Sequence, residues 1–93
     1  MSDFPEEYAA AYATARSCLI ALARSSPCCE AATFDELLFE LDDLHGGPGP
    51  ATYPVVAGRA DLLVWFESAV RRMIAAGGDV DALELIVLVA CAV

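Results

Sequence analysis

Apolar residues recur every three or four positions along most of the chain, the spacing that predicts amphipathic helices. The first stripe is Tyr8, Ala11, Tyr12, Ala15, Cys18, Leu19 and Leu22. The second is Phe34, Leu37, Leu38, Leu41 and Leu44. The third is Val55, Leu62, Trp65, Phe66, Ala69, Val70 and Met73. Together with an apolar stretch at the end of the chain, these stripes predict four helices.

Proline, glycine and capping residues set the predicted helix boundaries. Helices are expected over residues of about 5–24, 34–45, 55–76 and 81–92. Pro27 ends the first helix, and Thr33 with Glu36 forms a capping box that opens the second. Residues 28–32 are therefore expected to form a loop. Glycine and proline are concentrated in residues 46–54, which predicts an extended linker.

The last predicted helix is apolar on every side from Leu85 to Val93. A helix of this kind must be surrounded by other groups. Its β-branched residues would also suit a strand, but no second strand candidate is available to pair with it. The pattern thus predicts an all-α, small four-helix bundle-like domain over residues 1–93. We expect the last helix to be buried centrally or in the interface of a homodimer, or to be covered by a different partner.

The net charge narrows the classes of partner. The chain has 93 residues, is 58% hydrophobic and carries a net charge of −9, and its basic residues are five arginines. Direct binding of nucleic acid is disfavoured, because it requires a basic surface. The acidic start of the sequence does not suggest a signal peptide. The apolar run at the end is too short for a membrane span of about 20 residues, so we expect a cytoplasmic protein without a membrane partner.

The residues that commonly carry catalysis or bind metals are sparse. The four cysteines lack the spacing of a zinc site, and His45 is the only histidine. A phosphate-binding loop is also missing, since the glycines of the linker lack the lysine that such a loop needs. The sequence therefore predicts no metal site, no cofactor and no catalytic residues. An enzyme is disfavoured but left open.

The second predicted helix carries the strongest candidate binding site. Acidic residues lie opposite its apolar stripe, at Asp35, Glu36, Glu40, Asp42 and Asp43. Like charges this close destabilise a helix, so a basic protein surface would relieve them. Tyr53, on the rigid linker, is a candidate aromatic anchor. The primary hypothesis is a protein–protein interaction module that docks or inhibits a basic partner through Asp35, Glu36, Glu40, Asp43 and Tyr53. The competing interpretation is a solvated face that keeps the protein soluble.

An apolar cavity is the alternative hypothesis for function. Its candidate lining is Tyr12, Trp65, Phe66 and Met73. Such a cavity would suit a small-molecule-binding protein or a small enzyme. Adjacent residues on a helix point about 100° apart, so Trp65 and Phe66 need not share a face. One of them can belong to the core while the other lines a pocket.

The middle of the chain resembles one known family over a minor part of its length. An acidic helix, then His45-Gly46-Gly47-Pro48-Gly49, then Tyr53-Pro54 is similar to the nuclease-bacteriocin immunity proteins. The resemblance implies a small acidic four-helix inhibitor that blocks a basic nuclease with its second helix and a short, tyrosine-rich third helix. Thr52 stands in place of the second tyrosine of the family's paired motif, and the apolar tail has no counterpart. We therefore do not assign the chain to that family.

Overall fold

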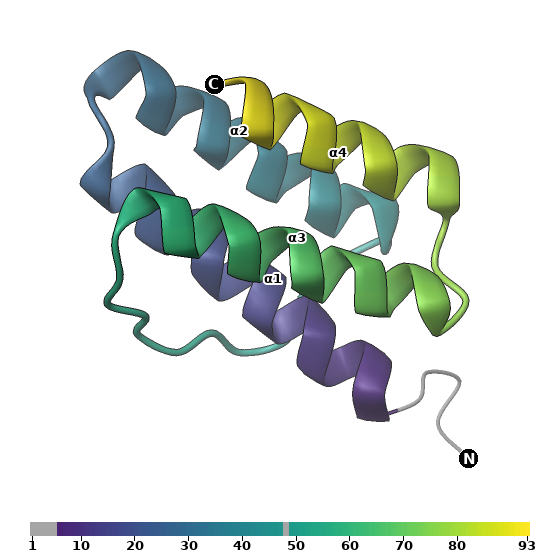
Figure 1. Cartoon of the computed structure of the whole chain (residues 1–93). Coiled ribbons are helices and arrows are strands. Elements are labelled where there is room, and N and C mark those ends of the chain that lie inside the picture. The colour runs from purple at the N-terminus through teal and green to yellow at the C-terminus, as the bar shows by residue number, and fades with distance from the viewer. Residues whose placement is uncertain (1–5, 48) are drawn as a thin grey trace.

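A computed structural model of the chain describes residues 6–47 and 49–93, and the described residues form a four-helix domain (Figure 1). The helices are α1 (Glu6–Ser25), α2 (Cys28–Leu44), α3 (Arg59–Ala75) and α4 (Val80–Ala92). No strand occurs in the described part of the chain. The all-α prediction is therefore confirmed.

The helices form a ring in which each packs against two others. α1 contacts α2 and α3, and α4 contacts the same two helices from the opposite corner. Within the described residues, the backbones of α1 and α4 do not approach each other closely. In Figure 1, α2 and α3 run in one direction, whereas α1 and α4 run in the other. The chain must therefore return along the length of the molecule between α2 and α3.

The core contains the whole first predicted stripe and most of the other two, whereas Leu44 and Trp65 are exposed and Leu38 and Val55 are half-buried. All seven residues of the first stripe are buried in α1. Phe34, Phe66 and Met73 have no exposed surface, and Ala15 and Ala69 are equally buried. Their small side chains allow α1 and α3 to approach closely. Burial of each large side chain contributes about 1.5–3 kcal/mol, so this core supplies most of the stability of the fold.

The predicted start of α2 is wrong. The helix begins at Cys28, so the predicted loop over 28–32 is helical, and Pro27 occupies the N-cap position. The Pro27 carbonyl accepts a hydrogen bond from the N–H of Ala31 at 2.8 Å. Thr33 lies inside the helix and donates its hydroxyl to the Cys29 carbonyl at 3.3 Å. The proline that ends α1 thus also opens α2, and Thr33 does not cap the helix.

The predicted start of α3 is also wrong. Residues 49–58, which we call the strap, contain no helix, and α3 begins only at Arg59 with Gly58 as its N-cap residue. Tyr53 donates its backbone N–H to the Ser17 hydroxyl at 3.1 Å, and Arg16 donates to the Pro50 carbonyl. These bonds tie the strap to α1. The short third helix that the immunity-protein resemblance implies is absent from the strap.

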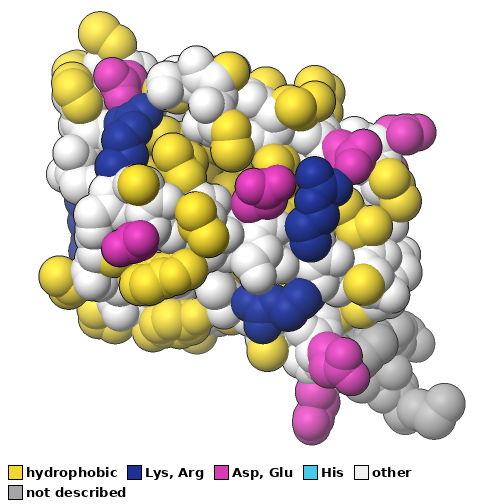
Figure 2. Space-filling view, in the orientation of Figure 1, with side chains coloured by type: hydrophobic (Ala, Val, Ile, Leu, Met, Phe, Trp, Pro, Cys, Tyr) yellow, Lys and Arg dark blue, Asp and Glu magenta, His cyan; other side chains and the backbone are white. Residues whose placement is uncertain are grey.

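α4 is not buried centrally, which corrects that part of the prediction. Its inner residues Leu83 and Ala90 are fully buried, but Leu85 is 61% exposed and Leu88 is 66% exposed. α4 occupies a corner of the ring, so its outer side faces solvent. Figure 2 shows hydrophobic side chains scattered over the face that α3 and α4 present. The predicted start of the first helix, at residue 5, lies outside the described residues.

Contacts of Arg59 and Asp79 stabilise helix ends. Arg59 lies 2.5 Å from the Glu30 carboxylate, stacks over the Phe34 ring at 5.5 Å and donates to the Val93 carbonyl at 2.9 Å. It thereby joins the starts of α2 and α3 to the end of the chain. Asp79 caps α4 by accepting a hydrogen bond from the N–H of Ala82 at 3.2 Å.

Candidate functional site

The outer face of α2 carries the predicted acidic residues. Asp35, Glu36, Glu40 and Asp43 are all exposed. The residues at 36, 40 and 43 are four and three positions apart, which places them on one side of the helix. None of the four forms an ion pair with any described residue. This part of the predicted site is therefore a continuous, uncompensated negative surface.

Phe39 lies in the middle of these carboxylates and is 71% exposed. It follows Glu36 by three positions and Asp35 by four, and it precedes Asp43 by four, so it shares their side of α2. Sequence reasoning missed this residue, because the apolar stripe was assigned to other positions. The sequence does contain a signal for Phe39: it is an aromatic residue that is out of phase with the apolar stripe and has acidic residues on either side. We call Asp35, Glu36, Phe39, Glu40 and Asp43 the acidic face.

Asp42 does not belong to the acidic face, although the sequence grouped it there. Its carboxylate points toward α1 and accepts hydrogen bonds from Arg16 Nε at 2.9 Å and Arg16 Nη2 at 3.0 Å. The Tyr12 hydroxyl also donates to it at 2.6 Å. Burial, the hydrogen bond and the charge of Asp42 together raise the pKa of Tyr12. Asp42 thus joins α2 to α1 and is not available to a partner.

His45 extends this polar contact at the end of α2. Its Nδ1 lies 2.7 Å from the Leu41 carbonyl, which can only accept, so Nδ1 carries the proton. In the neutral ring, Nε2 then accepts from the Tyr8 hydroxyl at 2.5 Å. The Tyr12 ring stacks on the imidazole with a centroid distance of 4.1 Å. Tyr8, Tyr12, Arg16, Asp42 and His45 therefore form a polar lock between the two helices.

The polar lock combines residue types that are common in catalytic sites, but its buried position indicates a structural role. Tyr8 and Tyr12 are each only 5% exposed. No member of the lock lines either of the two surface grooves described below. Within the described residues, no cluster of three or more histidine, cysteine or acidic side chains is placed to hold a metal ion.

Tyr53 is not near the acidic face. Its hydroxyl lies 2.6 Å from the Thr14 hydroxyl of α1, and because Thr14 already donates to the Ala10 carbonyl, Tyr53 is the donor. Tyr53 lines a groove of about 370 Å³ between α1, the strap and α3. The structure therefore separates the predicted aromatic anchor from the acidic helix.

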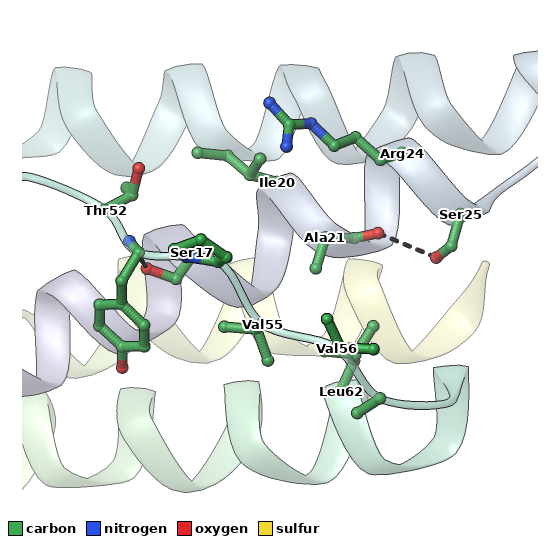
Figure 3. Close-up of a pocket in the computed structure, with 12 residues that line it drawn as sticks. Ser17, Ile20, Ala21, Arg24, Ser25, Thr52, Val55, Val56 and Leu62 are labelled. Carbon is green, nitrogen blue, oxygen red and sulfur yellow. Dashed lines mark hydrogen bonds between the residues drawn. The ribbon is translucent and has the colours of Figure 1, made fainter.

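The predicted apolar cavity does not form as expected. Phe66 and Met73 are completely buried in the core, and Tyr12 faces the polar lock. Trp65 alone of the four is 44% exposed, and it lines the same groove as Tyr53. Trp65 and Phe66 therefore lie in different surroundings, a point that the sequence left open. A second groove, of about 560 Å³, follows the strap past Ile20, Val55 and Leu62 (Figure 3).

Comparison of the chain with protein-family models, curated proteins and solved structures found no match. Among the described residues, no helix is both long enough and apolar enough to span a membrane. The four cysteines are all free thiols. Function is therefore inferred from the chemistry of the surface.

Proposed function

We propose that this protein is an interaction module that docks or inhibits a basic partner protein through the acidic face of α2. The observation that carries the proposal is the position of Phe39. It is 71% exposed and is surrounded by four exposed carboxylates that have no ion-pair partner among the described residues. An exposed aromatic residue inside a charged rim is the usual composition of a protein interface.

Three physical effects would favour the binding of such a partner. Each like-charge pair three or four residues apart on a helix destabilises it by about 0.2–0.5 kcal/mol, and arginine or lysine side chains of the partner would relieve this repulsion. Burial of Phe39 in an apolar pocket would add about 1.5–3 kcal/mol. Complementary charge would also accelerate association and select against acidic proteins. The net charge of −9 is why we do not propose nucleic acid as the partner.

A pull-down from source lysate, read by native mass spectrometry, tests the proposal. We expect a stoichiometric basic protein at low salt that is lost at moderate salt, as the Debye length falls from about 30 to about 10 Å. The triple variant Glu36→Gln, Glu40→Gln, Asp43→Asn should no longer capture it, and Phe39→Ser should capture much less.

The matched control is Glu6→Gln, Glu7→Gln, Asp81→Asn, which removes the same charge from exposed positions on α1 and α4. This control should retain the partner. Equal capture by the triple variant and the wild type would contradict the proposal. Capture that persists at moderate salt, or that is lost equally in the control, would show that the acidic face is not the contact.

We also propose a homodimer formed through the outer side of α4. Leu85, Leu88 and Val89 support this, since they are 61%, 66% and 37% exposed on one helix. Sedimentation equilibrium should give a dimer that the double variant Leu85→Glu, Leu88→Glu converts to a monomer. Phe39→Glu is the control and should leave the dimer intact. A wild-type monomer at high concentration would contradict this proposal.

We propose that the protein is cytoplasmic. The support for this compartment is that all four cysteines are unpaired, as expected where thiols are kept reduced. Fractionation of source cells with an antibody against the chain tests this placement.

A further inference from the structure

The groove that contains Tyr53 is the one that also brings together Trp65 and Arg72. Its volume is about 370 Å³, within the usual range of about 300–1,000 Å³ for small-molecule sites. Trp65 is 44% exposed, Tyr53 48% and Val56 96%. Pro54 completes this aromatic and apolar lining. The groove therefore offers exposed ring surfaces to a flat apolar group.

Arg72 supplies the charge of this groove. Three of the five arginines are paired with carboxylates: Arg16 with Asp42, Arg59 with Glu30, and Arg71 with Glu67 and Glu84. Arg72 is exposed, lines the groove and has no carboxylate partner among the described residues. The groove lining includes no acidic residue. In a chain with a net charge of −9, this is a local site of positive charge.

The helix dipole favours an arginine at the end of α3, but it does not explain why the side chain of Arg72 lines the groove. Arg72 lies in the last turn of α3, where the helix dipole favours a cation. Arg71 is its direct neighbour, yet it points toward α4 and contacts Glu84 at 2.7 Å. The two side chains therefore occupy different surroundings on the same turn. Arg71 provides a matched control for any test of Arg72.

The Tyr53 side of the aromatic wall is held in place by hydrogen bonds to α1. Tyr53 is held by its hydroxyl at Thr14, 2.6 Å away, and by its backbone N–H at Ser17, 3.1 Å away. Ser17 is 2% exposed and donates in turn to the Ala13 carbonyl at 2.7 Å. A preorganised wall lowers the entropic cost of binding. Arg24 lines the neighbouring groove, which Figure 3 shows, and is not part of the lining of this one, so Arg24 does not supply the charge here.

From these observations we infer that the groove binds a small organic anion with a planar apolar body, of the aromatic carboxylate class. The ring stacks on the surface formed by Trp65 and Tyr53. The carboxylate pairs with the guanidinium of Arg72, a geometry that permits two parallel hydrogen bonds. The lining residues belong to α1, the strap and α3, so this site is separate from the acidic face and does not rest on the proposed function.

The test uses 2-naphthoate as the probe and 2-naphthalenemethanol as its uncharged analogue. Trp65 is the only tryptophan, so its indole N–H gives a single assignable signal in the ¹⁵N–¹H correlation spectrum. We expect a saturable shift of this signal with 2-naphthoate. The alcohol should bind about tenfold more weakly, a difference of about 1.4 kcal/mol, since it cannot form the charge-assisted hydrogen bond to Arg72.

Two variants distinguish specific binding in this groove from non-specific binding elsewhere on the protein. Arg72→Gln should weaken binding of 2-naphthoate about tenfold and leave the binding of the alcohol unchanged. Arg71→Gln removes the same charge one residue away and should bind like the wild type, and the spectrum itself reports that each variant is folded. Equal affinity of Arg72→Gln and wild type would overturn the inference. So would a non-saturable shift of Trp65, or shifts confined to α4.

Discussion

Asp42 and Asp43 are adjacent in sequence but face opposite environments. The Asp42 carboxylate accepts two hydrogen bonds from Arg16 and lies in the polar lock between α1 and α2. Asp43 is exposed on the acidic face and has no ion-pair partner among the described residues. One carboxylate thus stabilises the fold, and its neighbour is available to a partner.

The two residues should respond differently to removal of their charge. Asp42→Asn should lower the free energy of unfolding by about 1.5–3 kcal/mol, because it leaves the Arg16 guanidinium without its counterion in a partly buried site. Asp43→Asn should change stability by no more than about 0.5 kcal/mol. Urea denaturation followed by circular dichroism measures both. Equal losses in the two variants would contradict the assignment of Asp42 to the polar lock.

Alkaline pH should destabilise the protein through the two lock tyrosines. Burial, and then the negative charge of Asp79, raises the pKa of Tyr8; burial and the contact with Asp42 raise the pKa of Tyr12. The folded state therefore favours the protonated phenols. Their contribution to stability is complete below the ordinary tyrosine pKa of about 10 and is lost as the pH rises above it.

Urea denaturation between pH 8 and about pH 11 measures this loss, spanning the ordinary tyrosine pKa. In Tyr12→Phe, which cannot ionise at that position, the fall in unfolding free energy over this interval should be smaller than in the wild type. The comparison uses the slope with pH, because the variant also loses a hydrogen bond at every pH. Parallel slopes would show that Tyr12 ionises as easily in the folded chain as in the unfolded chain.

The strap should be sensitive to a single methyl group at Gly49. A Cβ there would lie 2.5 Å from Arg16 Cδ and 2.8 Å from Asp42 Oδ1. Gly49→Ala should therefore displace the Arg16–Asp42 pair and cost about 1–3 kcal/mol. Gly47→Ala is the control, since its Cβ would meet nothing within 4 Å. Thermal unfolding measures the stability of both variants. A Gly49→Ala variant as stable as Gly47→Ala would contradict the close packing at Gly49.

The cysteines should divide into three reactive thiols and one protected thiol. Cys28, Cys29 and Cys91 are exposed, whereas Cys18 is buried in the core of α1. Burial also raises the pKa of Cys18, which reduces the fraction of reactive thiolate. A thiol-specific chromogenic reagent should titrate three equivalents rapidly in native protein and the fourth only in denaturant. Four fast equivalents would mean that Cys18 is accessible in the folded state.

Local sequence pattern predicts the helices well where local interactions determine them. The stripe of α1 and the glycine turns have a fixed spacing or backbone requirement, and Gly46 and Gly77 do adopt positive φ angles of 77° and 105°. The pattern fails where two local signals compete. Pro27 and Thr33 are both acceptable helix openers, and only the structure shows that the first one is used.

Long-range contacts determine the features that the sequence could not predict. Val55 fits the helical spacing of the third apolar stripe. The hydrogen bonds of Tyr53 to Thr14 and Ser17 instead hold this region outside any helix. Asp42 turns inward because Arg16, 26 residues away, and Tyr12 donate hydrogen bonds to it from α1. The exposure of Phe39 likewise depends on the rotation of α2 against α1, which the spacing of apolar residues defines only approximately.

The strap also has a consequence for the order in which the chain folds. Short turns join α1 to α2 and α3 to α4, so the contacts within each of these hairpins are local and close quickly. The contacts between α1 and α3 require the much longer segment between α2 and α3 to close, which carries a larger entropic cost. We therefore expect two preformed hairpins whose docking limits the rate of folding. Substitutions that loosen the strap should slow refolding, while those confined to the outer side of α4 should leave the refolding rate unchanged.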